Sequence, residues 1–454
     1  MQAILFRKCL GLTDARALGT QKMFTDPRDP NAGSAELIDS LNLTTTPDGC
    51  LEKIAPFVTA LTHSAPITNI SAGSRFIYQD GIDTKEWNGT DVATLAAVMD
   101  GPIAHTPLDV RVSNGSVYKS IVSGLPLLAA TLGDTSNLPD RDVKPYYAQP
   151  LFKQAFEYEG HIYSINPADS RFLQYSLYAH YDVWAIGDDH IGHISPILQA
   201  GAIKGGGIVC LHESGVSVYV GTNMSNFVKK FYPCSPIDGT LYSGFIDKAL
   251  AYGHIFLCKD GVYLVDASGA PVNLTLNSMD RLDVFNSSYN GSIVSDGKYL
   301  AFGDTYAIEY DFLTKTFLKR SSFGVTSTTS WDGTAYYAVG SNIVTLGTEI
   351  DTTDDFGCSL TLPYSDWSAS GTKSIEALYF TGTLNGDVLF TATDQTGKSW
   401  ELEVSEEWVN VSDKRIKTPK GMMGNHVSLK IECTSGSFRL EELRAEISGS
   451  KRSK

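Results

Sequence analysis

The residues with the clearest potential for chemistry lie in one short stretch, residues 187–193 (GDDHIGH), where two histidines three positions apart follow two carboxylates. Imidazole and carboxylate groups together can bind a divalent metal ion. On a strand, however, His190 and His193 would point to opposite faces, and Asp-rich turns with His are ordinary solvated loops. We therefore expect a loop here and assign no metal-ligating residue.

Glycoside hydrolysis would need two carboxylates across a pocket, which propeller glycosidases place on inner strands. The candidates are Asp266, Asp296, Asp304 and Asp332. Each lies in a turn-like segment, where Asp is expected for its local hydrogen bonding, and nothing singles out a pair. A propeller glycosidase stays open as an alternative, without assigned catalytic residues.

Other catalytic and cofactor patterns are missing from the sequence, which contains no G-x-S-x-G elbow, no Walker loop and no HExxH motif. The run Gly205-Gly206-Gly207 lacks the strand, helix and lysine of a phosphate-binding loop, so we interpret it as a turn. We expect a protein that is not an enzyme, with no cofactor-binding residue and no cofactor.

Aromatic side chains offer a second class of function, because sugars stack on exposed Trp and Tyr. The available tryptophans are Trp87, Trp184, Trp331, Trp367, Trp400 and Trp408. In β-sheets, aromatic residues more often pack in the core or pair across strands. Carbohydrate binding at a host surface therefore stays as an alternative to a purely structural role.

Composition narrows the class of protein. Of the 454 residues, 42% are hydrophobic and 19% charged, which is typical of a folded chain. The formal charge of -15 argues against a protein that grips nucleic acid, because binding phosphates needs clustered cations. Seven dispersed cysteines without a CxxC pair predict reduced, mostly buried thiols. Apolar stretches such as residues 124–133 are too short to span a membrane.

Turn dipeptides punctuate the chain and define the elements that must position any site. Asn114-Gly115, Asp296-Gly297 and Asp332-Gly333 are examples, each flanked by short runs of β-branched and aromatic residues. Asn-Gly and Asp-Gly tolerate the positive φ angles of tight hairpins. The sequence therefore predicts an all-β fold made mostly of antiparallel hairpins.

The hairpins recur at a regular spacing. Their anchor residues are Tyr78, Tyr118, Tyr163, Ile208, Phe256, Tyr299 and Tyr337, at steps of 40, 45, 45, 48, 43 and 38 residues. A four-stranded propeller blade takes about 40 to 50 residues. We predict a β-propeller of about seven blades, with six or eight as open alternatives. Two β-sandwiches would also give evenly spaced strands, but no linker divides this segment.

The predicted propeller occupies residues 66–350. Residues 1–65 precede it and could supply either the outer strand that closes the ring or an arm that reaches a neighbouring subunit. After an acidic loop at residues 348–357, residues 358–447 alternate with period 2, which predicts a small C-terminal β-sandwich. Residues 448–454 (SGSKRSK) are predicted to be a disordered basic tail.

Four elements of the central segment form a pattern: residues 219–221, Pro233-Cys234, residues 260–265 (DGVYLV) and residues 273–275 (NLT). Together they resemble the middle of β-propeller structural proteins from tailed bacteriophages. In that family a strand ending in Y-x-x-x-G, shortened here, leads to a loop with Cys and Pro. The next strand contains the pattern G-[VL]-Y-L-V, and a short segment with the pattern x-L-T ends the unit.

Both ends of the chain extend this resemblance. The family's opening pattern is matched by Asn42, Gly49, Leu51 and Pro56, and the pattern of its C-terminal sandwich is matched by Lys420-Gly421, Gly424 and residues 438–443. The resemblance covers most of the chain, but it consists of strands and turns. It supplies no active-site residues.

The resemblance implies a virion part made in the host cytoplasm, namely the tail nozzle or a tail-tube or hub protein of a short-tailed phage. It further implies a homo-oligomeric ring of six copies that docks the tail tube, adaptor and fibres. DNA would pass the lumen only as transient cargo. An acidic protein suits a conduit, because it repels phosphates at close range.

Overall fold

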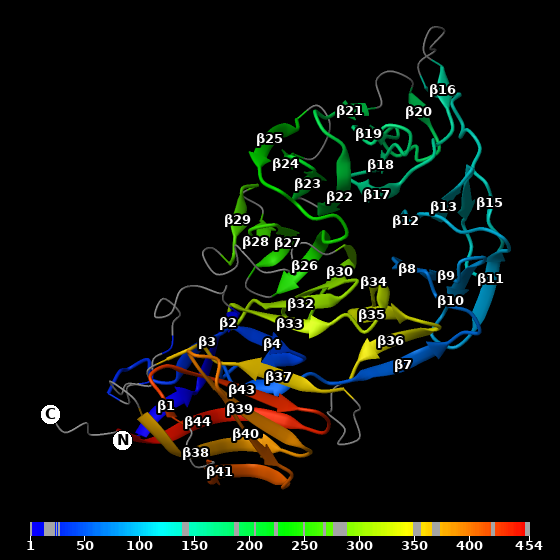
Figure 1. The fold of residues 1–454 in the computed structure, drawn as a ribbon. Coiled ribbons are helices and arrows are strands. Elements are labelled where there is room, and N and C mark those ends of the chain that lie inside the picture. The colour runs from blue at the N-terminus through cyan, green and yellow to red at the C-terminus, as the bar shows by residue number, and fades with distance from the viewer. Residues whose placement is uncertain are drawn as a thin grey trace.

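The computed structural model describes residues 2–12, 23, 25, 28–138, 145–185, 190–203, 206–221, 226–247, 250–266, 269–275, 288–347, 356–365, 373–418 and 423–449. Within these residues the regular elements are strands, numbered β1 to β44. Seven four-stranded antiparallel sheets form a ring, and a β-sandwich packs beside it (Figure 1). The predicted all-β fold, a β-propeller of seven blades with a small sandwich, is confirmed. The described part of the chain contains no helix that could cross a bilayer.

The first three blades come from the first half of the chain. Blade 1 consists of β8 (Asn69–Ala72), β9 (Phe76–Gln79), β10 (Thr84–Trp87) and β11 (Val92–Ala96). Blade 2 consists of β12 (Ile103–His105), β13 (Val110–Asn114), β14 (Ser116–Ser120) and β15 (Leu128–Ala129). Blade 3 consists of β17 (Gln154–Tyr158), β18 (His161–Ile165), β19 (Phe172–Tyr175) and β21 (His190–Gly192). A two-stranded sheet, β16 (Tyr146–Tyr147) with β20 (Trp184–Ala185), accompanies blade 3.

The other four blades complete the ring. Blade 4 consists of β22 (Ile197–Ile203), β23 (Gly207–His212), β24 (Gly215–Val220) and β25 (Val228–Pro233). Blade 5 consists of β26 (Tyr242–Asp247), β27 (Ala251–Cys258), β28 (Gly261–Val265) and β29 (Pro271–Asn273). Blade 6 consists of β30 (Tyr289–Ser295), β31 (Lys298–Gly303), β32 (Tyr306–Asp311) and β33 (Thr316–Ser321). Blade 7 consists of β34 (Val325–Trp331), β35 (Thr334–Val339), β36 (Asn342–Leu346) and β7 (Phe57–Thr62).

The predicted Asp-Gly turns connect neighbouring strands as expected from their backbone preferences. Asp296 and Gly297 have φ angles of 51° and 71°, and Asp332 and Gly333 have 48° and 79°. Two consecutive residues with positive φ define the tight hairpin whose twist matches that of the strands it joins. These dipeptides therefore set the registers of β30 with β31 and of β34 with β35.

The anchor residues identify the second strand of a blade in six of seven cases. The exception is Tyr118, which lies in the third strand of blade 2, β14. The second strand of that blade, β13, carries Val110, Arg111 and Val112 and no aromatic residue. The first aromatic residue that fits the anchor spacing is therefore Tyr118 in the next strand, β14. Arg111 is buried there, and its role is described below.

The ring closes between strands from distant parts of the sequence. Strand β7 is the outer strand of blade 7, where it pairs antiparallel with β36, so that Phe57 faces Leu346 and Thr62 faces Asn342. Blade 7 thus combines three strands from its own segment with one that precedes blade 1. The propeller begins at β7, before the boundary at residue 66 that the sequence suggested.

The sandwich has two sheets, and both contain N-terminal strands. One sheet contains β41 (Trp408–Lys417), β38 (Lys373–Leu384), β44 (Phe438–Gly449), β6 (Leu51–Lys53) and β5 (Leu43–Thr45), with β1 (Gln2–Phe6) on β44 and β42 (Met423–Gly424) on β38. The other contains β4 (Asp39–Leu41), β37 (Cys358–Thr361), β43 (Val427–Cys433), β39 (Val388–Asp394) and β40 (Ser399–Val404). Strands β2 (Lys8–Leu12) and β3 (Ser34–Leu37) form a separate parallel pair, and Cys9, Ala35 and Leu37 from this pair are buried in the sandwich core.

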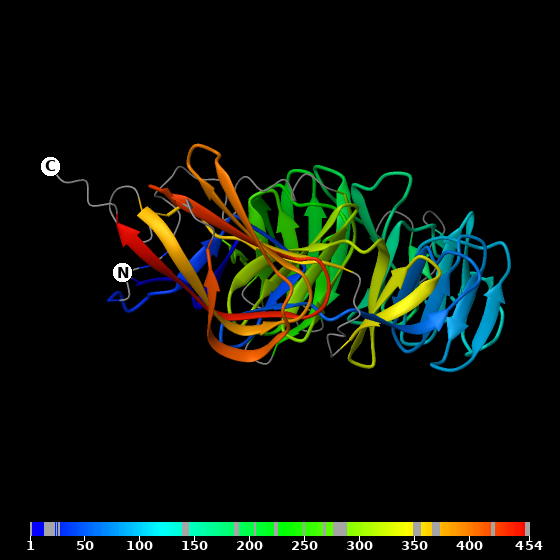
Figure 2. The same ribbon diagram turned by 60° about the horizontal axis from the view of Figure 1, so that its bottom comes forward.

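Of the two alternatives for residues 1–65, the outer strand that closes the ring is present as β7, and the described strands before it pack in the sandwich of the same chain. The physical reason is hydrophobic burial: Leu5, Leu43 and Leu51 are fully buried in the same core as Leu440 and Ile431 of the C-terminal strands. Strand β44 also runs to Gly449 and takes in two residues predicted for the tail, whereas residues 450–454 lie outside the described part. In the rotated view the sandwich lies at one end of the molecule and blades 1 and 2 at the other (Figure 2).

Asn42 joins the sandwich to the propeller. Its backbone N–H donates to the carbonyl of Lys319 on β33 (3.2 Å), and its side-chain oxygen accepts from the N–H of Ser321 (2.8 Å). Its side-chain amide donates to the carbonyl of Gly357 (2.8 Å), where the chain returns from the propeller. Asn42 is 2% exposed and has a φ of 56°, a conformation that Asn tolerates better than most residues.

A buried ionic network reinforces this junction. Glu309 on β32, which is fully buried, forms ion pairs with Arg320 and with Lys298 (Nζ to Oε1, 3.3 Å), and it accepts a hydrogen bond from Thr44 Oγ1 (2.6 Å). Burial lowers the pKa of Lys298. Because Thr44 belongs to the sandwich and the charged groups to blade 6, the network ties the two parts together.

Replacing Asn42 tests this junction. We expect Asn42→Ala to lower the free energy of unfolding by about 3 kcal/mol, since it removes two hydrogen bonds from buried groups and strains a backbone with positive φ. Asn42→Gly also removes the two hydrogen bonds but accepts the positive φ without strain, so it should lower the free energy of unfolding by less. Guanidinium denaturation of the full chain measures both, and two equal losses, or none, would contradict this role.

Candidate functional site

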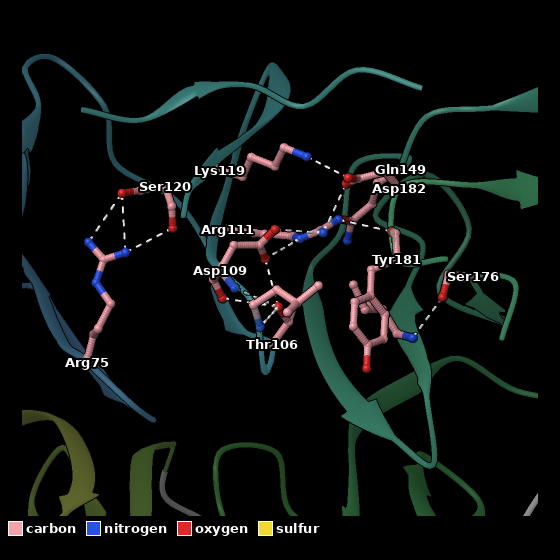
Figure 3. Close-up of polar contacts among 12 residues, drawn as sticks. Arg75, Thr106, Asp109, Arg111, Lys119, Ser120, Gln149, Ser176, Tyr181 and Asp182 are labelled. Atoms are coloured by element: carbon pink, nitrogen blue, oxygen red, sulfur yellow. Dashed lines mark hydrogen bonds and ion pairs between the residues drawn. The ribbon is translucent and has the colours of Figure 1, made fainter. Parts of the chain in front are cut away.

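A cluster of buried and half-buried charged side chains lies where blade 2 meets blade 3 (Figure 3). Arg111 on β13 and Lys119 on β14 come from blade 2, and Asp182 precedes β20 on the side of blade 3. A cavity of about 360 Å³ adjoins the cluster, and its walls include Asn137 and His180. Buried charges beside a cavity are the usual starting point of a functional site, so we describe this one in detail.

The Arg111 side chain is only 1% exposed, and each of its nitrogens faces a protein oxygen. Nε and Nη2 donate to the two carboxylate oxygens of Asp109 (2.8 and 2.9 Å). Nη1 donates to Gln149 Oε1 (2.6 Å) and to the carbonyl of Tyr181 (3.1 Å), and Nη2 lies 3.0 Å from Asp182 Oδ1. The Arg111 guanidinium is therefore held by protein groups on both sides of the blade junction.

The turn before β13 places the Asp109 carboxylate. Thr106 Oγ1 accepts hydrogen bonds from the backbone N–H groups of Leu108 (3.1 Å) and Asp109 (3.0 Å). The same hydroxyl donates to Asp109 Oδ1 at 2.9 Å. Hydroxyl groups commonly bond the backbone two or three residues ahead, so the local sequence Thr-Pro-Leu-Asp is enough to fix this side chain.

Asp182 connects the two cations of the cluster. Its Oδ2 lies 2.5 Å from Lys119 Nζ, while Oδ1 contacts Arg111. The two cations are thus matched by the two carboxylates of Asp109 and Asp182. A charge-balanced cluster of this kind is suited to fastening two blades.

A second clamp of the same kind joins blades 1 and 2. Arg75 donates to both oxygens of Glu86 (2.8 and 2.6 Å) and to the carbonyl of Ser120 (2.9 Å). Burial alone would raise the pKa of Glu86, but hydrogen bonds from Arg75, Gly124 and Ser123 outweigh it and hold the pKa below its usual range. The repeated use of arginine–carboxylate pairs shows how neighbouring blades are locked together here.

The two histidines of residues 187–193, where we expected a loop without metal ligands, do not act together. His190 is exposed on β21 and packs edge-on against Phe172 (5.1 Å between ring centroids), whereas His193 is directed to blade 4. Asp188 and Asp189 lie outside the described residues. In the described ranges no group of three or more His, Cys, Asp and Glu side chains could hold a metal ion.

His193 instead forms a pair with His212, which the sequence analysis did not single out. His193 Nδ1 lies 3.1 Å from His212 Nε2, and Tyr219 Oη lies 3.2 Å from His193 Nε2. Burial, and next the neighbouring His212, lowers the pKa of His193 to about 3; burial lowers that of His212 to about 4. No local sequence signal announces this pair, because it forms between two blades.

The four candidate carboxylates are not brought together. Asp296 and Asp332 occupy hairpin turns of blades 6 and 7, and Asp304 lies between β31 and β32, where it accepts from Asn290 (3.3 Å). Asp266 follows β28 of blade 5. Of the glycine run, Gly206 lies in the turn before β23, Gly207 is the first residue of β23, and Gly205 lies outside the described residues.

The tryptophans are not the exposed aromatic residues. Trp87, Trp184 and Trp408 are buried, Trp331 and Trp400 are half-buried, and Trp367 lies outside the described residues. Other aromatic side chains are exposed instead: Tyr178 (68%), Tyr252 (59%), Phe245 (48%) and Phe231 (47%). The sequence does not distinguish them, since exposure depends on where a loop lies on the folded blade. Of the seven cysteines, Cys50 and Cys234 are half-buried and the rest are buried.

Comparison with solved structures yields propellers of low sequence identity. PorZ, a surface component of the type-IX secretion system of Porphyromonas gingivalis, is 12% identical (TM-score 0.39) and covers 70% of this chain, which spans only 44% of the PorZ chain. YCF48 bound to D1 peptide is 10% identical (0.42), with 68% of this chain and 98% of YCF48 covered. The extracellular domain of BT4673 from B. thetaiotaomicron is 9% identical (0.45), with 91% and 66% covered.

No protein-family model matches the chain, and no curated protein matches it. At these TM-scores the structural comparisons add nothing to what the strand pairing itself establishes. The pairing defines the class: an all-β protein with a seven-bladed propeller whose ends are built into a β-sandwich.

Removing the cation of the blade 2–blade 3 clamp should be costly. We expect Arg111→Met to lower the free energy of unfolding by about 3 to 5 kcal/mol, because two carboxylates lose a buried partner. Arg171→Met is a matched control: Arg171 also pairs with an aspartate two residues earlier, Asp169 (2.6 Å), but is exposed, so no measurable change is expected. Guanidinium denaturation compares them, and similar effects of both changes would contradict the clamp.

The histidine pair predicts a pH dependence. Because the folded pKa values of about 3 and 4 lie below the usual value of 6.5, the unfolded chain binds more protons between those limits. Stability should therefore be complete above pH 6.5 and fall as the pH approaches 4. His193→Gln should reduce this fall, whereas His190→Gln, at an exposed position, should not. Thermal melting of each variant at pH 7 and pH 5 tests this. If the drop in melting temperature between the two pH values is the same in both variants as in the unchanged protein, the prediction is wrong.

Proposed function

We propose that this protein is a structural component of a bacteriophage tail, a nozzle or a tail-tube or hub protein, that forms part of the conduit for DNA and docks other tail proteins. It acts without catalysis and belongs to the virion after synthesis in the host cytoplasm. The observation that carries the proposal is that several residues of the matched pattern, among them Asn42, Pro56 and Asn273, form hydrogen bonds that hold the fold together. That role suits a mechanical part of a particle.

The opening pattern supplies residues at the junction of propeller and sandwich. Asn42 binds blade 6 and the returning chain, as described above. Leu51 is fully buried in the sandwich core, and the carbonyl of Pro56 accepts from the N–H of Gly347 (2.8 Å). Pro56 precedes β7 and Gly347 follows β36, so this bond ties the entry of the chain into the propeller to its exit.

The central pattern supplies a clasp in blade 5. Thr275 Oγ1 accepts from the N–H of Val262 (3.0 Å), and Asn273 Oδ1 accepts from the N–H of Thr275 (2.8 Å). The Asn273 amide donates to the carbonyl of Asp260 (3.2 Å) at the hairpin turn. Gly261 is required there, since a Cβ atom would lie 2.2 Å from Thr275 Oγ1. The N-L-T element thus holds the hairpin of the D-G-V-Y-L-V element.

The proposed assembly is a symmetric ring of copies. Propeller blades bury their faces against one another, whereas β40 and β41 lie at the edges of their sheets in the described structure. Edge strands present unpaired N–H and carbonyl groups, which favours subunit contacts through the sandwich. The copy number of six comes from the family resemblance. The formal charge of -15 supports a lumen that passes DNA without holding it.

Analysis of purified particles tests the proposal. We expect mass spectrometry to detect the protein in gradient-purified virions at several copies per particle, with a replication protein from the same lysate as the absent control. Reconstruction of the tail should place it in a ring around the DNA path. A protein found only in the lysate would refute the structural role, and one to three peripheral copies would refute the ring.

A further inference from the structure

A second cavity, of about 310 Å³, lies at the junction between blades 2 and 3. Its described walls are Tyr178, the hairpin of Glu157, Glu159 and Gly160, and Pro107 from blade 2. It adjoins the cavity beside Arg111, because consecutive residues line the two: Pro107 and Leu108, and Tyr178 and Ala179. We refer to these two neighbouring cavities together as the blade 2–3 groove.

Tyr178 is a fixed and exposed aromatic platform in this groove. It is the most exposed of the described aromatic side chains, at 68%, although its back is well supported. Gly160 lies directly beneath the ring, where a Cβ atom would be 2.7 Å from the ring carbons, and His161 packs edge-on at 5.6 Å. The backbone N–H of Ala179 donates to the carbonyl of Gly160 (2.8 Å) and anchors the segment. A ligand can stack on this ring without first having to order it.

The polar groups of the groove are both acceptors and donors. Glu157 and Glu159 contribute carboxylates at the Tyr178 end, and one oxygen of Glu157 is held by the N–H of Gly160 (2.7 Å). The other end offers the ammonium of Lys119, the amide of Asn137 and the imidazole of His180. Carboxylates near the platform are not matched by a lysine or arginine among the described residues that line that end.

We propose that the blade 2–3 groove binds a saccharide that carries no negative charge. The flat ring of Tyr178 and the side chain of Pro107 offer apolar surfaces for the C–H face of a sugar ring. Hydroxyl groups both donate and accept, which matches the mixed groups along the groove, whereas a basic peptide would use only the acceptors. The two glutamates repel anionic sugars at the platform. This inference is independent of the proposed role in a phage tail.

The test uses the purified full chain on an array of neutral, amino-bearing and acidic glycans. Neutral or amino-bearing glycans should bind and acidic ones should not. In titration calorimetry with the best neutral binder, Tyr178→Ala should weaken binding by about tenfold or more, whereas Tyr178→Phe keeps the ring and should retain most of the affinity. Tyr252→Ala is the matched control, since Tyr252 is also exposed (59%) but lies in blade 5, and it should bind like the unchanged protein.

Three results would overturn the proposal: no binding of uncharged glycans, equal losses in Tyr178→Ala and Tyr252→Ala, or a lysine-rich peptide that binds through Tyr178 while no glycan does. Melting curves of each variant show whether it is folded, and Tyr178→Phe covers the case in which the alanine variant is not. Incorporation of Tyr178→Ala into particles is scored separately, so a failure of glycan binding leaves the structural role of the protein unaffected.

Discussion

The whole molecule depends on how its propeller is closed. Each blade buries its faces only against its neighbours, so an open junction would expose two blade faces at once. Closure rests on the pairing of β7 with β36, strands that stand almost 300 residues apart in the sequence. The chain enters this junction from the sandwich and returns to the sandwich after it, as Asn42 and the Pro56–Gly347 bond show. Strain that would part β7 from β36 must therefore also disrupt the sandwich.

The blades are held together by two different kinds of contact. Between blades 4 and 5, aliphatic and aromatic side chains such as Val209, Val218 and Phe256 form a continuous apolar core. Around blade 2, smaller apolar clusters, such as Val110 with Leu95 and Val117 with Ile162, are joined by the arginine–carboxylate clamps of Arg75 and Arg111. Buried ion pairs add little net stability, because desolvation offsets their attraction, but a shifted blade would leave charges unpaired at high cost. The clamps therefore define the position of blade 2 more than they strengthen it.

The sequence was sufficient for features that depend on local residue types. Dipeptides such as Asp332-Gly333 predict hairpins because few other residues accept their φ angles, and the spacing of the anchors follows from the size of a blade. Features formed between distant segments were not predictable. Pairing of β1 with β44, the contact of His193 with His212 and the exposure of Tyr178 all depend on which blades become neighbours. The sequence did not identify β13 as the second strand of blade 2, because β13 carries Arg111 instead of an aromatic residue.

The arrangement separates the two surfaces to which we assign binding. The N-terminal segment that leads into the sandwich packs on blade 6, where Asn42 bonds to β33. Blades 2 and 3, whose residues line the groove, lie on the far side of the ring (Figure 1). The sandwich of the same chain consequently cannot cover the groove. A subunit held by the edges of its sandwich would keep Tyr178 accessible, so assembly and ligand recognition can proceed on one chain without competing for the same residues.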